Sequence, residues 1–88
     1  MALIEFYGEE CPHCVTMAPL IERLEKELGM KVERYETWHN AANERKRKVF
    51  DKNDECGGVP FFINEETGAR ICGAVAYDSL KEWAGTKK

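Results

Sequence analysis

Apolar and charged residues alternate in blocks along the chain, and the first two blocks predict a strand followed by a helix. Residues 2–7 form a mostly apolar run that ends at Gly8, which is typical of a buried strand with little alternation. Over residues 11–28, apolar side chains recur every three or four positions and charged ones fill the opposite face, which predicts an amphipathic helix. Pro12 fits the first turn of such a helix, and Gly29 is a natural C-terminal stop.

The next two blocks are more polar. Residues 31–37 predict a second strand, and their many charged side chains suit the edge of a sheet better than its centre. Residues 40–52 predict a second helix, with Asn40 as its N-cap and with Val49 and Phe50 facing inward.

The last third of the chain predicts a hairpin and a helix. Two short runs, 61–64 and 69–73, flank a polar turn and are expected to pair as antiparallel strands. The final helix begins near Asp78 or Ser79 and ends at Gly85, and Ser79 has capping-box spacing with Glu82. The residues expected to pack inward from it are Leu80, Trp83 and Ala84.

This order of elements predicts an α/β domain. The first strand, the first helix and the second strand form a βαβ unit, whose strands should be parallel with a right-handed crossover. The closing hairpin adds antiparallel pairing, so we expect a mixed sheet of about four strands flanked by about three helices. The chain has 88 residues, 43% hydrophobic and 33% charged, and we therefore expect residues 1–88 to form a single globular domain.

Charge and hydropathy argue against two classes of partner. A formal net charge of -3 is unfavourable for nucleic-acid binding. The basic run 45–48 has acidic neighbours on both sides, so we expect it to be a solvated helix face rather than a phosphate site. No apolar stretch approaches the roughly 20 residues of a membrane span, and the first residues lack the features of a secretory signal. We therefore expect a soluble, cytoplasmic protein with no nucleic-acid or membrane partner.

Four cysteines, Cys11, Cys14, Cys56 and Cys72, offer the candidate chemistry. Cytosolic thiols are kept reduced, so redox catalysis or metal binding is expected before a structural disulfide. A zinc site built from all four thiolates is one alternative, but Cys56 and Cys72 are far apart in the sequence and do not form a close pair. We expect Cys56 to be an incidental loop cysteine, with an auxiliary thiol near the active-site surface as the alternative. Cys72 is expected to be a small buried side chain, with no metal bound.

The segment Cys11-Pro12-His13-Cys14 points to thiol–disulfide exchange. Cys11 falls at the N-cap of the first helix, where free N–H groups and the helix dipole favour an exposed thiolate, and Cys14 lies one turn further on, close enough to resolve a mixed disulfide. Pro12 stiffens the turn, and the imidazole of His13 further favours the Cys11 thiolate. The two acidic residues at positions 9–10 act in the opposite sense.

On these residues the chain resembles the thioredoxin superfamily over nearly all of its length. Residues 4–19 are similar to the family's strand, active-site turn and kinked helix, with Pro19 at the position of the helix-bending proline. Residues 58–60, Gly-Val-Pro, resemble its cis-proline loop, and residues 73–83 resemble its last strand and helix. The resemblance implies a thioredoxin-like three-layer fold.

The resemblance also implies roles for further residues. Glu5 falls where thioredoxin carries a buried acid, and a carboxyl group in an apolar strand should have a raised pKa, which suits a relay for the proton of Cys14. A cis bond between Val59 and Pro60 would leave the Val59 backbone free to pair with an extended substrate. The alternatives are an outward-pointing Glu5 and an ordinary turn proline.

We therefore expect a monomeric thiol–disulfide oxidoreductase that exchanges a Cys11–Cys14 dithiol or disulfide with protein substrates. It needs no cofactor, but a partner reductase or oxidant must reset the cysteine pair. His13 favours an oxidant, because the dipeptide Pro12-His13 resembles that of strongly oxidising family members, whereas residues 9–10 and the missing secretory signal favour a reductant. The alternatives from other classes are a redox-inactive binding module of the same fold and the four-cysteine zinc site.

Overall fold

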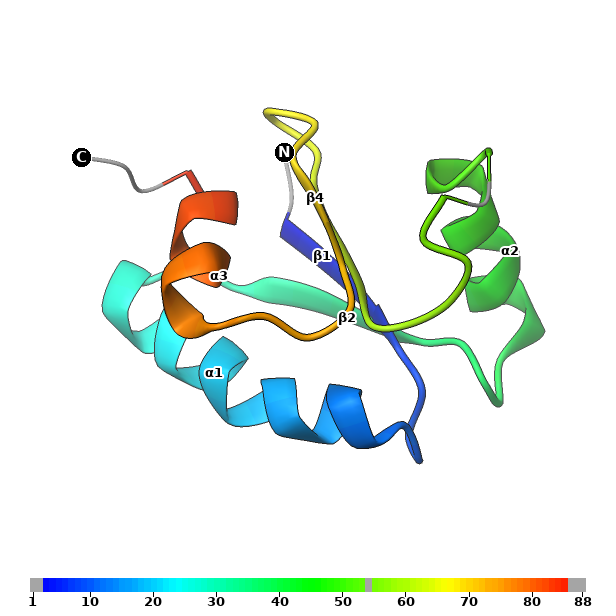
Figure 1. Cartoon of the computed structure of the whole chain (residues 1–88), viewed down its shortest axis with the longest axis horizontal. Helices are drawn as coiled ribbons and strands as arrows, with labels where there is room; N and C mark the ends of the chain where they lie inside the picture. The colour runs from blue at the N-terminus through cyan, green and yellow to red at the C-terminus, as the bar shows by residue number, and fades with distance from the viewer. Residues whose placement is uncertain (1–2, 54, 86–88) are drawn as a thin grey trace.

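The computed structural model describes residues 3–53 and 55–85, and its elements follow the expected order (Figure 1). Ala2, which the sequence placed in the first strand, lies outside the described residues. The elements in chain order are β1 (Leu3–Tyr7), α1 (Pro12–Leu28), β2 (Val32–Glu36), α2 (Ala41–Phe50), β3 (Phe61–Asn64), β4 (Arg70–Cys72) and α3 (Tyr77–Trp83).

The four strands form one mixed sheet in the order β2-β1-β3-β4. Strand β1 pairs in parallel with β2 and antiparallel with β3, and β3 pairs antiparallel with β4. The predicted α/β class, the parallel βαβ unit and the closing hairpin are confirmed. Strand β2 lies at an edge, as its charged side chains predicted.

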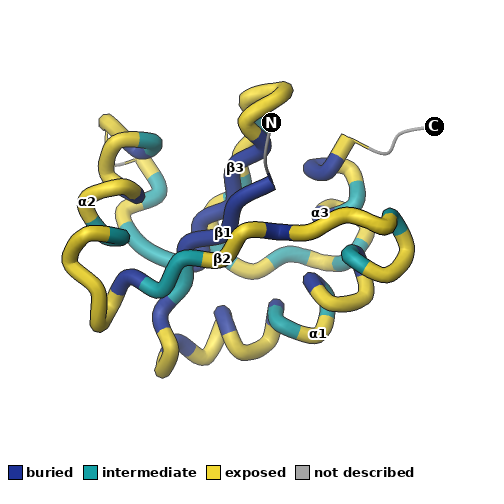
Figure 2. The backbone as a smooth tube through the Cα atoms, turned by 180° about the vertical axis from the view of Figure 1, so that it is seen from behind, coloured by how far each residue is buried: buried dark blue, intermediate teal, exposed yellow. Residues whose placement is uncertain are grey.

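Helices cover both faces of the sheet, so the molecule has three layers (Figure 1). Helices α1 and α3 lie on one face, and α2 lies on the other. The core between the sheet and α1 and α3 consists of Leu3, Met17, Ile21, Leu24, Val32, Phe62, Leu80, Trp83 and Ala84. A second cluster on the opposite face consists of Ile4, Phe6, Phe61 and Ile63. Successive residues of β1 therefore point to opposite faces, and the strand is buried on both (Figure 2).

Helix α1 has the ends that its sequence predicts. Cys11 is the N-cap, and its Sγ atom accepts a hydrogen bond from the backbone N–H of Cys14. Gly29 ends the helix with φ 64°, a left-handed conformation that suits glycine, and its N–H donates to the carbonyl oxygen of Glu25. Pro19 lies inside the helix, where the sequence placed it.

Helix α2 differs from the prediction in which face it buries. Val49 is 65% exposed rather than inward, although Phe50 does pack against the second cluster and Asn40 is the N-cap. Arg47, which belongs to the basic run expected to be solvated, is buried. At about 100° per residue, position 49 lies on the side of the helix opposite position 47, so burying Arg47 turns Val49 outward.

Helix α3 begins earlier than predicted. Its first residue is Tyr77, and its N-cap, Ala76, makes no side-chain capping bond. The Ser79–Glu82 capping box is therefore wrong: Ser79 already lies inside the first turn, where its N–H donates to the carbonyl oxygen of Ala76. Leu80, Trp83 and Ala84 are buried, as predicted. Within residues 3–53 and 55–85, no helix combines the length and the apolar character needed to cross a membrane.

We predict that Phe62→Ala destabilises the chain by about 3–5 kcal/mol, measured by denaturant unfolding. Phe62 is fully buried and meets the ring of Trp83 edge-on, with 5.4 Å between ring centroids, so truncation removes core contacts and leaves a cavity. The control is Val49→Ala, which should change stability by about 0.5 kcal/mol or less because Val49 is exposed. Equal losses from the two substitutions would contradict this core.

Candidate functional site

The site begins where β1 ends and α1 starts. The backbone of Cys11 is extended, with φ -74° and ψ 118°, which turns its side chain back over the helix N-terminus. The N–H of Cys14 lies 3.4 Å from Cys11 Sγ, and Cys11 Sγ lies 4.0 Å from the carbonyl oxygen of Val59. The peptide bond between Val59 and Pro60 is cis, as the resemblance implied. The structure thus brings Cys11, Cys14 and the loop of residues 58–60 together.

Cys11 is more shielded than the sequence predicted. It was expected to be exposed, but only 4% of its surface is accessible, and Cys14, one turn further into the helix, is buried as well. The intervening residues, Pro12 and His13, are exposed. The contact with the carbonyl oxygen of Val59 helps to cover Cys11 Sγ. A molecule that reaches this sulfur must therefore pass next to the loop of residues 58–60.

Cys14 carries the more strongly perturbed thiol. Burial is the main cause that raises its pKa to about 12, and the hydrogen bond with Cys11 and the charge of Glu5 act in the same direction. At neutral pH the Cys14 thiol therefore keeps its proton, and it needs a base before it can act as a nucleophile.

Glu5 lies in the middle of β1, and its side chain is completely buried. It shares its sheet face with Leu3, which packs in the core beneath α1, so its carboxyl group faces the helix that carries the cysteines. The expectation of a buried acid is confirmed, and the outward-pointing alternative is wrong. Burial raises the pKa of this carboxyl group, although Arg34 acts in the opposite direction.

Arg34 is a partner of Glu5 that the sequence analysis missed. The two residues are register neighbours on β1 and β2, and Arg34 Nε donates to Glu5 Oε1 over 2.7 Å. The other oxygen, Glu5 Oε2, is buried and has no hydrogen-bond partner within the described part of the chain. The guanidinium also stacks over the ring of Tyr7, 4.7 Å from its centroid. The sequence did offer one signal for this contact, a basic residue in the strand that follows α1. It did not specify the register between β1 and β2, and therefore not which residue of β1 would be the partner.

A small cavity of about 150 Å³ lies beside these groups. Cys14 and Arg34 both line it, whereas Glu5 is buried beneath and is not part of its lining. Its volume has room for a few water molecules, since each occupies about 30 Å³ in the liquid. The complete lining is Tyr7, Gly8, Glu9, Cys14, Val15, Ala18 and Arg34.

Trp38, in the loop that follows β2, contacts the turn that follows β1. Its indole lies directly against Gly8, so a side chain on Gly8 would overlap the ring, yet 52% of the Trp38 surface is exposed. Because β1 and β2 are parallel, the loops that follow them lie at the same edge of the sheet. That geometry brings an exposed aromatic side chain next to the cysteine turn.

Ionic and hydrogen-bonding contacts connect the same two loops. Glu36 accepts hydrogen bonds from the backbone N–H groups of Glu9 and His39, at 3.0 and 2.8 Å. His39 Nε2 lies 2.7 Å from Glu10 Oε1, and this contact raises the pKa of His39. When protonated, His39 offsets the negative charge of Glu10. Glu10 then disfavours a Cys11 thiolate less than the sequence alone predicted.

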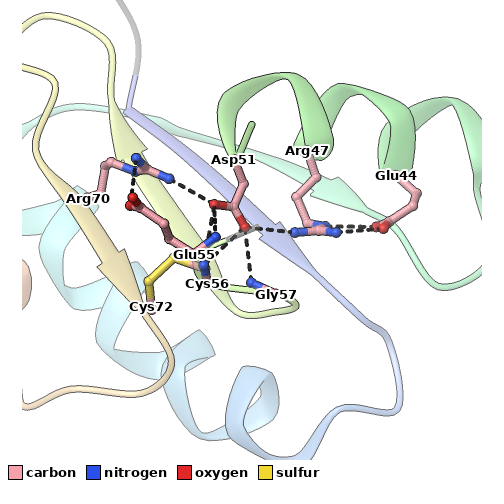
Figure 3. A network of polar contacts seen from close by, with 8 residues as sticks. All are labelled: Glu44, Arg47, Asp51, Glu55, Cys56, Gly57, Arg70 and Cys72. Atoms are coloured by element: carbon pink, nitrogen blue, oxygen red, sulfur yellow. Dashed lines mark hydrogen bonds and ion pairs between the residues drawn. A yellow bond between two sulfur atoms is a disulfide. The ribbon is translucent and has the colours of Figure 1, made fainter. Parts of the chain in front are cut away.

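Cys56 and Cys72 are joined by a disulfide, with 5.2 Å between their Cα atoms (Figure 3). The expectation of an isolated loop cysteine at position 56 is wrong, and Cys72 is exposed rather than buried. Their proximity follows from the hairpin, which places β4 beside the segment that enters β3. Because the four cysteines form two separate pairs, this arrangement disfavours the four-thiolate zinc site.

In comparisons with known proteins, no model of a protein family matches the chain, and no curated protein is significantly similar to it. The assignment of a function therefore depends on the geometry of the site.

We predict that Glu5→Gln stabilises the chain relative to the wild type by an amount that increases with pH. Because the folded pKa of Glu5 is raised, its proton stabilises the folded state fully below the unfolded value of about 4.5. This contribution is lost as the pH rises through the folded pKa. Glutamine has no proton to lose, so the difference in unfolding free energy should grow by about 1.4 kcal/mol for each unit by which the pKa is raised.

The measurement is urea unfolding of both proteins at several pH values between about 5 and 8. Other titrating groups, including Cys14, are common to the two proteins and cancel in the difference. A difference that does not change with pH would contradict a raised pKa at Glu5.

Proposed function

We propose that the chain is a thiol–disulfide oxidoreductase of thioredoxin-like fold that acts on protein disulfides or dithiols. The observation that carries the proposal is the pair of free cysteines at the start of α1, with the Cys14 N–H directed at Cys11 Sγ. A sulfur at a helix N-terminus with an N–H donor beside it is a favourable place for negative charge. The loop at Val59 lies next to this sulfur.

In the first step, the Cys11 thiolate attacks one sulfur of a client disulfide. A bond forms between Cys11 Sγ and that sulfur, the client S–S bond breaks, and the other client sulfur leaves as a thiolate. The N–H of Cys14 and the first turn of α1 stabilise the attacking thiolate. His13 and Pro12 lie at the exposed start of the helix, where they affect the turn and its charge.

In the second step, Cys14 resolves the mixed disulfide. Its thiol transfers a proton to the carboxylate of Glu5, whose charge acts on this thiol, and its sulfur attacks Cys11 Sγ. The client sulfur that was bonded to Cys11 leaves as the second thiolate. The two electrons that reduce the client come from the thiols of Cys11 and Cys14, which are oxidised to the new disulfide. A raised pKa makes Glu5 a stronger base, while Arg34 keeps its ionised form accessible.

An extended client segment would pair with the backbone at Val59 and pass the exposed ring of Trp38. The reverse reaction oxidises a client dithiol, and the reduction potential of the pair decides the net direction. The chemistry needs no cofactor, but it does need a reductase or an oxidant that resets the pair. We propose a cytoplasmic monomer for this role.

We predict that Cys11→Ser reduces catalysed reduction of insulin disulfides by dithiothreitol to the uncatalysed background. Cys14→Ser should instead accumulate covalent mixed disulfides with the client, visible on a non-reducing gel. Glu5→Gln should slow the resolving step by roughly 10²-fold or more while leaving the first attack nearly unchanged. A single-turnover measurement separates the two steps.

The matched control is the double variant Cys56→Ser with Cys72→Ser, which keeps the proposed site and should remain active. Full multiple turnover by Cys14→Ser would contradict the assignment of roles. If wild type and Cys11→Ser are equally inactive, the chain is a redox-inactive binding module. Cys11, which is 4% exposed, then stays inaccessible to client disulfides.

A further inference from the structure

The loop that carries Cys56 is held by a buried carboxylate. Asp51, the C-cap of α2, accepts hydrogen bonds from three successive backbone N–H groups (Figure 3). Its Oδ1 lies 2.9 Å from the N of Glu55, and its Oδ2 lies 3.1 Å from the N of Cys56 and 3.0 Å from the N of Gly57. One side chain thus fixes the backbone of residues 55–57.

Two guanidinium groups complete the coordination of Asp51. Arg47 Nη1 lies 3.3 Å from Oδ2, and Arg70 Nη2 lies 3.0 Å from Oδ1. Although burial opposes it, the N–H donors of the loop hold the pKa of Asp51 below its usual value, so the carboxylate is ionised at neutral pH. None of these contacts involves a sulfur atom. The hydrogen bonds that hold this loop therefore do not depend on the bond between Cys56 and Cys72.

The two cysteines flank the loop at Val59 from both sides. Cys56 lies three residues before Val59 in the chain. Cys72 is the register partner of Phe61, and the next residue, Gly73, donates its N–H to the carbonyl oxygen of Pro60 at 2.8 Å. A bond between the two sulfurs thus connects the segments before and after this loop.

The two sulfurs differ in accessibility. Cys72 lies on β4, the exposed edge of the sheet, and is itself exposed. Cys56 is half-buried and packs against the second core cluster. An external thiol therefore has access to the sulfur of Cys72 before that of Cys56.

We propose that Cys56 and Cys72 form a second redox site, which opens and closes by exchange with a low-molecular-weight thiol such as glutathione. A glutathione thiolate attacks Cys72 Sγ, the Cys56–Cys72 bond breaks, and Cys56 leaves as a thiolate. A second glutathione thiolate attacks the sulfur of the glutathione bound to Cys72, which releases glutathione disulfide and the Cys72 thiolate. Two glutathione molecules are thereby oxidised, and one protein disulfide is reduced. Because Asp51 holds the loop in both states, the open pair stays positioned to close again.

The test uses the full chain with Cys11→Ser and Cys14→Ser, so that Cys56 and Cys72 are the remaining cysteines. The protein is equilibrated with buffers of varying ratio of glutathione to glutathione disulfide, quenched with acid, alkylated and weighed by mass spectrometry. The expected result is a transition from two alkyl groups to none as the disulfide fraction rises. A bond that stays closed at every ratio, or one that never forms, overturns the proposal.

Two further variants test which sulfur is attacked. Adding Cys56→Ser leaves Cys72 alone, and adding Cys72→Ser leaves Cys56 alone. Glutathione disulfide should modify Cys72 several-fold faster than Cys56, and equal rates or the reverse order would overturn entry at Cys72. Since Cys11 and Cys14 are absent throughout, these results do not depend on the proposed oxidoreductase activity, whose failure would appear separately in the insulin assay.

Discussion

A carboxyl group in the middle of the central strand is the constraint on which this structure depends. Strand β1 is covered by helices on both faces, and Glu5 lies within it with no exposed surface. Removing a carboxylate from water costs several kcal/mol unless a partner is close, and here Arg34 on the neighbouring strand provides one oxygen with a charged donor. Among residues 3–53 and 55–85, no group donates to the second oxygen. An apolar side chain at this position would leave no such unpaired oxygen. A chain selected for stability alone would not need this group, so its presence beneath a buried thiol favours a chemical role.

The fold could be predicted from the sequence because its signals are local. Periodicity places β1 and α1, Gly29 marks the end of that helix, and a strand–helix–strand order implies parallel pairing. The contact between Cys11 and Cys14 was predictable for the same reason, since it lies within one helical turn. Helix faces were less predictable: Val49 is apolar, yet the charged side chain of Arg47 occupies the buried face because it has Asp51 as a partner.

The contacts that were missed connect residues far apart in the chain. Glu5 and Arg34 are 29 positions apart, and Cys56 and Cys72 are 16 apart, so each pair depends on the register of strands that the sequence pattern leaves open. The position of Trp38 against Gly8 has the same origin, because it requires the loops after β1 and β2 to meet at one edge. Sequence reasoning therefore located the cysteine turn, the buried Glu5 and the loop at Val59, but it missed Arg34, the position of Trp38 and the pairing of Cys56 with Cys72.

The close approach of Trp38 to Gly8 links two positions that are distant along the chain. No side chain at position 8 fits beneath the indole, and a smaller residue at position 38 would remove that restriction while opening a hollow beside the cysteines. Substitutions at these two positions should therefore be tolerated together more readily than singly. Paired substitutions at positions 8 and 38 therefore offer a way to reshape the surface next to the cysteine turn without altering Cys11, Cys14 or the strand beneath them.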